Sequence, residues 1–177
     1  DIYSSNKQKK IKINKKDLIM CAKFRSGHFE GVLAVINQFL IKIKPSVMFL
    51  GKKDFQQIYL IKKFISGKFR TKIVQCKTIR NKNGLPYSSR NVLLNKKNFQ
   101  TAVNVSQIIK KFYSTLKLNF KKTKDIYLIK NKIINKNVKL EYLEIRNKLN
   151  LSKKINKKNF KIFIAYYING IRLIDNY

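Results

Sequence analysis

Two short stretches hold residues whose types and spacing suit phosphate chemistry. The first is Gly51-Lys52-Lys53-Asp54, which follows the apolar residues 47–50 and precedes a segment with helical periodicity. A strand that ends in glycine before a helix is the layout in which a parallel sheet presents a ligand site at the carboxyl end of a strand. The glycine would let a ligand approach the backbone, and the helix N-terminus beyond it favours an anion. The spacing is not that of a P-loop.

The second stretch places Ser88, Ser89 and Arg90 after a loop that contains Gly84 and Pro86. Two hydroxyls and a guanidinium are suited to phosphate oxygens. The same triplet is also suited to capping a following helix. A single lysine in a lysine-rich chain is most often a solvated charge, so the two stretches carry more weight together than either does alone.

The two stretches resemble the paired signatures of the pantothenate synthetase family, the pantoate–β-alanine ligases of the nucleotidylyltransferase superfamily. The family motifs read G-E-K-D-[FY]-Q-Q and D-G-L-[AM]-x-S-S-R-N, which match residues 51–57 and 84–91. Three further stretches match in the same order, namely RSGHFEGV at 25–32, YLEIR at 142–146 and RLIDN at 172–176. The resemblance therefore covers nearly the whole chain.

This resemblance implies an ATP-dependent ligase that condenses pantoate with β-alanine through pantoyl adenylate to give pantothenate, in the pathway to coenzyme A. ATP with Mg²⁺ would be the co-substrate, and the intact enzyme is expected to be a homodimer in the cytoplasm. Lys53 would be the catalytic residue, because charge on the phosphates must be neutralised as the bond to pyrophosphate breaks. The ATP-binding set implied by the resemblance is Gly51, Lys52, Lys53, Asp54, Ile79, Tyr87, Ser88, Ser89 and Arg90. The pantoate-binding set is Arg25, His28 and Gln57.

The resemblance also implies individual roles. Asp54 would accept hydrogen bonds from the ribose hydroxyls, and Ile79 would contact adenine through its backbone. From the residues alone, His28 fits a structural imidazole that holds a turn as well as it fits a site role. Gln57 likewise fits a surface position on a helix. Lys52 departs from the family, which carries an acidic residue there.

One family motif has no counterpart in this sequence. The chain has one histidine and so cannot contain the family's H-x-G-H motif. In the family that motif lies in an N-terminal segment that also supplies the first strands of the nucleotide-binding sheet. The resemblance thus implies the C-terminal portion of the enzyme, expected to bind ATP weakly and to lack ligase activity alone, or else an inactive remnant. Without those strands, the edge of the strand at 47–50 would be unpaired, which is an aggregation hazard.

The charge favours a different class of protein. The chain has 41 basic and 8 acidic residues, a net charge of +33, which is typical of nucleic-acid or anionic-membrane binding. However, only six of the basic residues are arginine, and the lysines are spread along the whole chain. Compositional drift towards lysine explains this pattern better, so a basic nucleic-acid-binding module is the alternative, and no specific nucleic acid or membrane partner is expected.

Metal and membrane sites receive little support from the sequence. One histidine and two cysteines give no zinc-type spacing, so no metal site is predicted. Two cysteines with no needed disulfide suit a reducing cytoplasm. No apolar run approaches the length needed to span a bilayer.

The predicted fold is α/β, with part of a Rossmann-like parallel sheet at residues 1–79 and a smaller α+β lid at 80–177. In the first part, Ile11 and Ile13 indicate an edge strand or a loop. Apolar spacing predicts a helix from residue 31 to Pro45, and the apolar run at 47–50 predicts a buried strand. A second helix that stops at Gly67 and a parallel strand at 72–76 complete a strand–helix–strand unit.

The second part is expected to pack helices on a small antiparallel sheet. The predicted helices contain residues 105–116 and 126–134, and the predicted strands are 138–142, 160–168 and 171–174. Asn169-Gly170 is a strong hairpin signal between the last two strands. Because strand–helix–strand crossovers are right-handed, the loops after residues 50 and 76 should leave the same sheet edge, which would let the two predicted phosphate-binding stretches converge.

Overall fold

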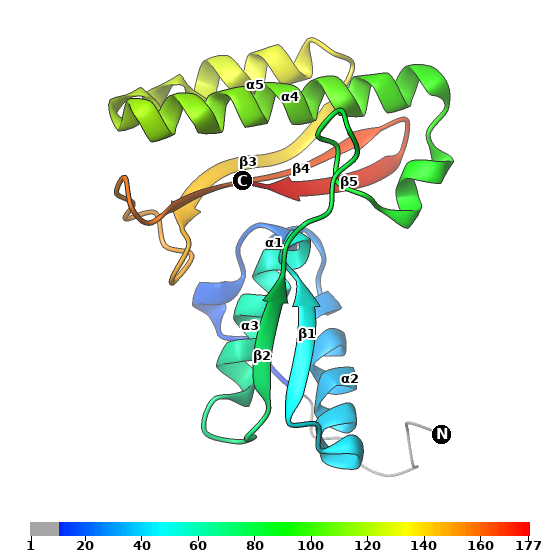
Figure 1. Ribbon diagram of the computed structural model, residues 1–177, viewed down its shortest axis with the longest axis vertical. Coiled ribbons are helices and arrows are strands. Elements are labelled where there is room, and N and C mark those ends of the chain that lie inside the picture. Colours follow the sequence, from blue (N-terminus) through cyan, green and yellow to red (C-terminus); the bar gives the residue numbers. More distant parts are fainter. Residues whose placement is uncertain (1–10) are drawn as a thin grey trace. The chain divides into compact units, whose positions relative to one another are not determined.

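A computed structural model describes residues 11–177, and the chain divides after Lys77 into two compact units (Figure 1). The division lies close to the boundary expected after residue 79. Within the described residues, no helix is long and apolar enough to cross a membrane.

The first unit contains a parallel strand–helix–strand motif preceded by helices. Its elements are η1 (Lys15–Asp17), α1 (Cys21–Phe24), α2 (His28–Ile43), β1 (Val47–Gly51), η2 (Lys52–Asp54), α3 (Phe55–Ile65) and β2 (Lys72–Cys76). The strands β1 and β2 are parallel, with Gly51 opposite Cys76. The carboxyl ends of both strands therefore lie at the same end of the sheet, as predicted, and the residues that follow β1 start from that end.

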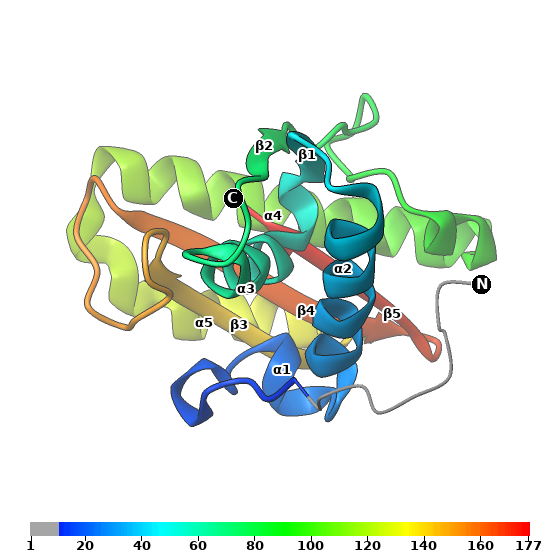
Figure 2. The ribbon, with the colours of Figure 1, turned by 90° about the horizontal axis from the view of Figure 1, so that it is seen from below.

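The core of the first unit lies on one face of its two-stranded sheet. Leu33 and Leu40 of α2 are buried with Ile61 and Ile65 of α3, and Met48 of β1 packs against them. Figures 1 and 2 show α2 and α3 on this same face.

The opposite face of β1 is not covered by the described residues. Val47 is 37% exposed and Phe49 is 69% exposed, because successive side chains of a strand point to opposite faces. The prediction of a buried strand at 47–50 is therefore wrong for Val47 and Phe49, and Met48 and Leu50 are half-buried. Within residues 11–177, β1 pairs on one edge only, with β2.

The chain before α1 forms no strand in its described part. Residues 11–14 are irregular, and Asn14 begins a single 3₁₀ turn by accepting a hydrogen bond from the N–H of Lys16 at 3.1 Å. The edge strand considered for Ile11 and Ile13 is wrong, and the alternative of a loop is confirmed. The physical reason is that Ile11 packs against the helical core, so burial and not strand pairing places it.

The second unit packs helices on a three-stranded antiparallel sheet. Its elements are η3 (Ser89–Leu93), α4 (Lys96–Leu118), η4 (Phe120–Asp125), α5 (Ile126–Ile134), β3 (Lys139–Asn147), β4 (Phe160–Ile168) and β5 (Ile171–Asn176). The strand order is β3-β4-β5. The hairpin prediction is confirmed, since Asn169 and Gly170 have φ angles of 46° and 77°, the positive values that a type I′ turn requires.

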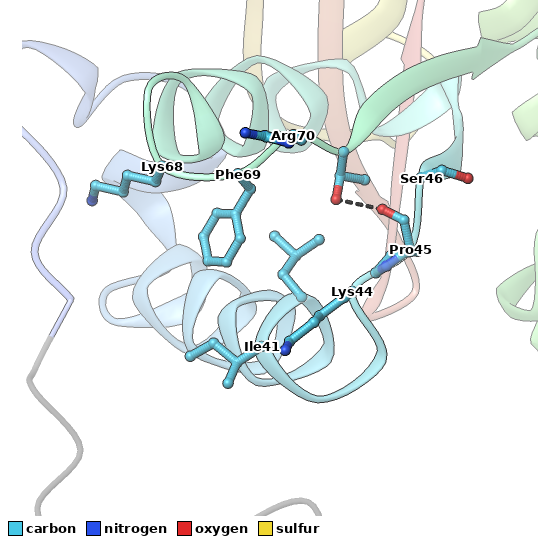
Figure 3. A pocket seen from close by; sticks show the side chains of 9 residues that line it. Ile41, Lys44, Pro45, Ser46, Lys68, Phe69 and Arg70 are labelled. Carbon is cyan, nitrogen blue, oxygen red and sulfur yellow. Dashed lines mark hydrogen bonds between the residues drawn. The ribbon is translucent and has the colours of Figure 1, made fainter.

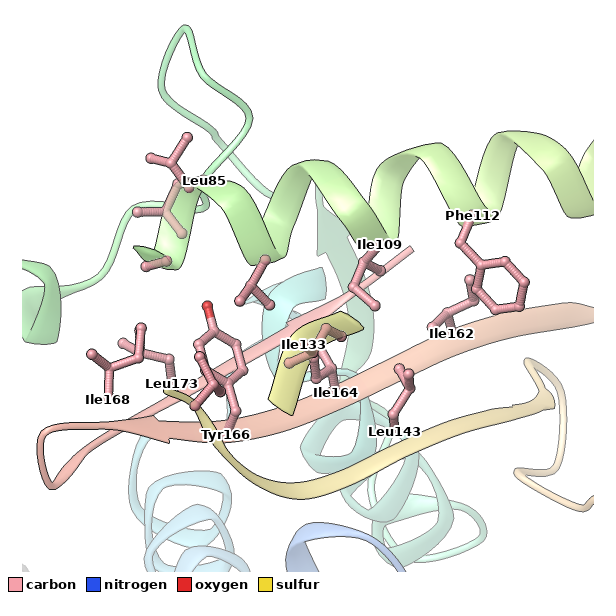
Figure 4. Close-up of a cluster of buried hydrophobic side chains, with 14 of the residues drawn as sticks. Leu85, Ile109, Phe112, Ile133, Leu143, Ile162, Ile164, Tyr166, Ile168 and Leu173 are labelled. Carbon is pink, nitrogen blue, oxygen red and sulfur yellow. The ribbon is translucent and has the colours of Figure 1, made fainter. Parts of the chain in front are cut away.

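The two helices α4 and α5 cover one face of this sheet (Figure 1). Figure 4 shows Ile109 and Phe112 of α4 above Ile162 and Ile164 of β4, with Ile133 of α5 between them. All five are at most 3% exposed, and burying a side chain of this size stabilises a fold by about 1.5–3 kcal/mol. This core fixes the strands to which the loop at residues 79–90 is attached.

Candidate functional site

The end of β1 has the geometry expected of a ligand-binding strand end. Gly51 has φ −72° and ψ 128°, an extended conformation that any residue can adopt. A Cβ atom built on Gly51 would meet nothing within 4 Å. The fold therefore does not require glycine here, and its missing side chain leaves open space beside the backbone.

The residues after Gly51 turn directly into helix. Lys52, Lys53 and Asp54 form η2, and α3 begins at Phe55. The two lysines are half-buried and Asp54 is exposed. Gly51, at the start of η2, has no side chain that could cap the turn. Asp54, at the start of α3, makes no side-chain hydrogen bond that caps this helix. Backbone N–H groups and a lysine thus lie together, which favours an anion.

The two glutamines that follow differ in their surroundings. Gln57, the predicted pantoate ligand, is half-buried. Gln56 is only 6% exposed, and its Nε2 donates to the carbonyl of Ile19 at 2.7 Å. The Oε1 atom of Gln56 is buried and has no hydrogen-bond partner. Sequence reasoning missed this residue, whose only signal was its place on the buried face of α3.

Arg25 and His28 contact each other at the start of α2. The Nη1 of Arg25 donates to the Nε2 of His28 at 2.7 Å. Because a guanidinium only donates, Nε2 must accept, and a neutral ring then carries its proton on Nδ1. The backbone N–H of His28 also donates to the carbonyl of Arg25 at 3.2 Å. The imidazole therefore holds a turn, and its pantoate-binding role stays a prediction.

The predicted residues of the second unit lie in and just after a closed loop. Ile79 and Tyr87 are exposed, and the N–H of Tyr87 donates to the carbonyl of Ile79 at 3.1 Å. The Oγ of Ser88 accepts from the N–H of Arg90 at 3.3 Å and caps η3, so the capping role holds for Ser88. Ser89 and Arg90 have exposed side chains.

Sequence reasoning did not single out the arginines that form ion pairs in the second unit. The pairs are Arg80–Asp175, Arg146–Glu144 and Arg172–Glu141. The sequence signal for these residues was that both kinds are rare, because only six of the 41 basic residues are arginine and only 8 residues are acidic. Three of the six arginines thus take part in these ion pairs, where the forked guanidinium suits a carboxylate.

The first unit also has an open cavity of about 580 Å³ that contains none of the predicted site residues (Figure 3). It lies at the amino ends of β1 and β2, where the hydroxyl of Thr71 donates to the carbonyl of Pro45 at 2.6 Å. Leu40 and Phe69 are among its lining residues. Because the strands are parallel, this cavity is at the opposite end of the sheet from Lys53.

Comparison with known proteins identifies the class and then the family. The fold matches solved pantothenate synthetases. One from Thermus thermophilus is 20% identical, with a TM-score of 0.85 over 99% of this chain and 65% of that one. The predicted fold class is thereby confirmed. A family model described as pantoate-beta-alanine ligase matches residues 1–177. The chain belongs to the pantoate–β-alanine ligase family.

Relatives from Francisella tularensis are more similar in sequence. The pantothenate synthetase of subspecies mediasiatica is 37% identical over 160 residues, which cover 90% of this chain and 53% of the relative. The pantothenate synthetase of subspecies novicida is 36% identical over the same coverage. A solved F. tularensis pantoate-beta-alanine ligase, complexed with beta-gamma ATP and beta-alanine, is 33% identical with a TM-score of 0.76, over 94% of this chain and 57% of that one. The chain thus spans about half the length of the curated relatives it matches.

Proposed function

We propose that this chain carries the ATP-binding and pantoate-binding elements of an AMP-forming ligase that joins pantoate to β-alanine. The observation that supports this most is the family match over the whole chain, with Lys53 in the 3₁₀ turn η2 that follows β1. The binding of ATP and β-alanine is proposed by similarity to the F. tularensis ligase complexed with a form of ATP and with beta-alanine.

In the proposed first step, a carboxylate oxygen of pantoate attacks the α-phosphorus of ATP. The bond to the β-phosphate oxygen breaks, so pyrophosphate leaves and pantoyl adenylate forms. Lys53 would neutralise the negative charge that develops on the phosphate oxygens as this bond breaks. Asp54, exposed one residue later, would accept hydrogen bonds from the ribose hydroxyls. The N–H groups at the start of η2 would add to the attraction for phosphate.

In the proposed second step, the amine of β-alanine attacks the acyl carbon of the adenylate. The acyl–oxygen bond breaks, AMP leaves, and the amine loses a proton as the amide forms. Gln57, Arg25 and His28 would hold the pantoyl group in place during both steps. Ser88, Ser89 and Arg90 would contact the phosphates of ATP, with Tyr87 and Ile79 beside the nucleotide.

A Mg²⁺ ion is proposed to arrive with the nucleotide, held by its phosphates. Among residues 11–177, no group of three or more His, Cys, Asp or Glu side chains is placed to hold a metal ion. The homodimeric state and the cytoplasmic location also stay predictions.

The test uses residues 1–177 joined to an N-terminal segment that carries the family's H-x-G-H motif. We expect pantoate-dependent exchange of labelled pyrophosphate into ATP, and pantothenate once β-alanine is added. We expect the 177-residue chain alone to bind ATP and to form no pantothenate, because groups that act together in a transition state are strongly non-additive. Exchange that does not depend on pantoate would contradict the proposed function.

A further inference from the structure

The segment at residues 79–90, which we call the serine–arginine loop, is closed on itself. Arg80 and Pro86 form an isolated antiparallel bridge. The N–H of Tyr87 donates to the carbonyl of Ile79 at 3.1 Å, one position further out. The chain therefore leaves the closed turn at a fixed point, and the proposed phosphate contacts follow immediately.

The side chain of Arg80 ties this loop to strand β5. Its Nη1 and Nη2 donate to the two carboxylate oxygens of Asp175 at 2.7 and 2.8 Å. The same guanidinium also donates to the carbonyl of Gly84 at 3.0 Å, to the hydroxyl of Tyr177 at 3.0 Å and to the carbonyl of Asn176 at 3.1 Å. One planar group thus joins acceptors of the loop with acceptors at the end of β5, which suits the fixed fork of arginine.

The charge of Arg80 is neutralised inside the protein by Asp175. Burial lowers the pKa of the guanidinium, but the hydrogen bond and ion pair with Asp175 outweigh burial, and the pKa is raised above its ordinary value. The guanidinium also stacks 4.2 Å from the ring centre of Tyr177. Burial, reinforced by the charge of Asp175, raises the pKa of the Tyr177 phenol. The phenol therefore keeps its proton, and Arg80 stays a charged donor whose charge is neutralised by Asp175.

Helix α4 supplies a third support for the loop through Ser106. The Oγ of Ser106 donates to the carbonyl of Gly84 at 2.9 Å and lies 2.8 Å from the hydroxyl of Tyr177. Gly84 has φ +89°, a left-handed conformation that favours glycine. This conformation aims the Gly84 carbonyl so that both Arg80 and Ser106 donate to it.

The other end of the loop also contacts β5. The Nη1 of Arg90 donates to the carbonyl of Arg172 at 3.5 Å. Just beyond the loop, the Nδ2 of Asn91 donates back to the carbonyl of Pro86 at 3.0 Å. The serine–arginine loop is therefore held on β5 mainly at its Arg80 end, with a longer contact at Arg90, and the RLIDN sequence of β5 has no role in the proposed chemistry.

We propose that Arg80 and Asp175 are positioning residues for the ATP site, because they hold the serine–arginine loop in the conformation that presents Ser88, Ser89 and Arg90. This inference rests on the proposed function. A loop that is ordered in advance avoids the entropy cost of ordering when the ligand binds. The Arg80 guanidinium is occupied by protein acceptors, so it acts through the loop and does not bind phosphate itself.

The chain contains a matched control for this proposal. Arg172 and Glu141 form an ion pair in the same sheet, with Nη2 2.5 Å from Oε1. The carboxylates of Glu141 and Asp175 are equally buried, each with 6% of the side chain exposed. Asp175→Asn and Glu141→Gln therefore remove the same charge from similar surroundings, but Asp175 bonds to the serine–arginine loop, whereas Glu141 bonds to Tyr167 and Arg172.

The first measurement is amide hydrogen exchange in the 177-residue chain. Relative to amides of α4, we expect Asp175→Asn to speed exchange at Asn81 and Tyr87 by about tenfold or more, because local opening loses its main restraint. Glu141→Gln should leave these two rates unchanged. If Asp175→Asn does not fold, Tyr177→Phe removes only hydroxyl contacts and should speed the same two amides. Equal rates in Asp175→Asn and Glu141→Gln would overturn the inference.

The second measurement is ATP affinity by calorimetry on the same proteins. We expect Asp175→Asn to raise the Kd for ATP by about tenfold or more, since small displacements of binding groups are costly. Glu141→Gln should bind ATP as the unmodified chain does. An equal Kd for ATP in the unmodified chain and in Asp175→Asn would overturn the inference. If the unmodified chain binds no ATP, the ATP-binding part of the proposed function fails, and hydrogen exchange still decides whether the pair orders the loop.

Discussion

The two predicted phosphate-binding stretches are positioned by different means. The lysine and aspartate after β1 are placed by the main chain, since a strand ends, a 3₁₀ turn follows and a helix begins. The serine–arginine loop is placed by side chains, and its main restraint joins residues 95 positions apart in the sequence, Arg80 and Asp175. The stretch after β1 thus depends on local geometry, and the serine–arginine loop depends on the completed sheet of its own unit.

This difference explains how the chain uses its few acidic and arginine residues. Of the four ion pairs found among residues 11–177, three lie in the second unit and each joins an arginine to a carboxylate. The pair in the first unit uses Lys63 with Asp17. A lysine serves as a point charge, whereas arginine fixes orientation through two parallel hydrogen bonds. The second unit places its arginines where orientation matters.

The largest effect is expected at Lys53. In the joined enzyme described above, Lys53→Ala should lower kcat by about 10²–10³, because a group that stabilises developing charge in a dry site contributes on that scale. Lys62→Ala removes the same charge from an exposed position of α3 and should leave kcat within about threefold, as solvent screens an exposed charge. Steady-state assays of pantothenate formation decide this. A Lys53→Ala enzyme with normal kcat would contradict the catalytic role.

The next largest effect is expected on the stability of the second unit. Asp175→Ala should lower its free energy of unfolding by about 3 kcal/mol, the lower end for a buried pair that loses one partner. The lower end applies because the Arg80 side chain is 22% exposed. Urea unfolding followed through amide resonances of each unit would separate the effects. Equal loss in both units would show that the restraint is not confined to the second unit.

The difference between placement by the local main chain and placement by long-range side-chain contacts explains which features the sequence could predict. The sequence indicated a ligand site at residues 51–54, after the apolar run at 47–50, because strand, turn and helix are encoded there within a few residues. Asn169-Gly170 indicated its hairpin for the same reason. The support of the serine–arginine loop could not be predicted, because Asp175 and Ser106 meet Arg80 or Gly84 only once α4 and β5 have packed. The exposed face of β1 was missed because an apolar run does not tell which face of a strand is covered.

A smaller effect is expected in the first unit at Gln56. Gln56→Met keeps the size of the side chain but loses the donor to the carbonyl of Ile19. Nε2 also donates to the carbonyl of Asp17 at 3.4 Å, and losing these bonds should cost about 1 kcal/mol. Removing the unpaired Oε1 offsets part of the cost, so the measured change should lie below that of Asp175→Ala. Urea unfolding of the first unit checks this. A larger loss than in Asp175→Ala would show that the first unit also depends on long-range side-chain restraints.

The smallest effect is expected for the buried phenols of the second unit. They should change the free energy of unfolding only at alkaline pH. Burial raises the pKa of Tyr166 and of Tyr177 above the ordinary 10.0, with a further contribution from the charge of Asp175. Below about pH 10 both phenols are protonated in the folded and the unfolded chain, so their contribution to stability is fully present. Above that pH the unfolded chain loses the protons first and binds fewer than the folded chain. Stability should therefore fall as the pH rises from about 10 through the folded pKa values.

The Tyr177 phenol links this pH dependence to the loop. Tyr177→Phe should flatten part of the alkaline decline in the free energy of unfolding, and Tyr166→Phe should flatten another part. Tyr127→Phe changes a phenol that is 70% exposed and should leave the decline as it is. Urea unfolding at a series of pH values measures all three. Because Tyr177 bonds to Arg80 and to Ser106, its ionisation should also speed amide exchange at Tyr87 before the unit unfolds. A decline in stability with no earlier loosening of Tyr87 would mean that the phenol stabilises the core without ordering the serine–arginine loop.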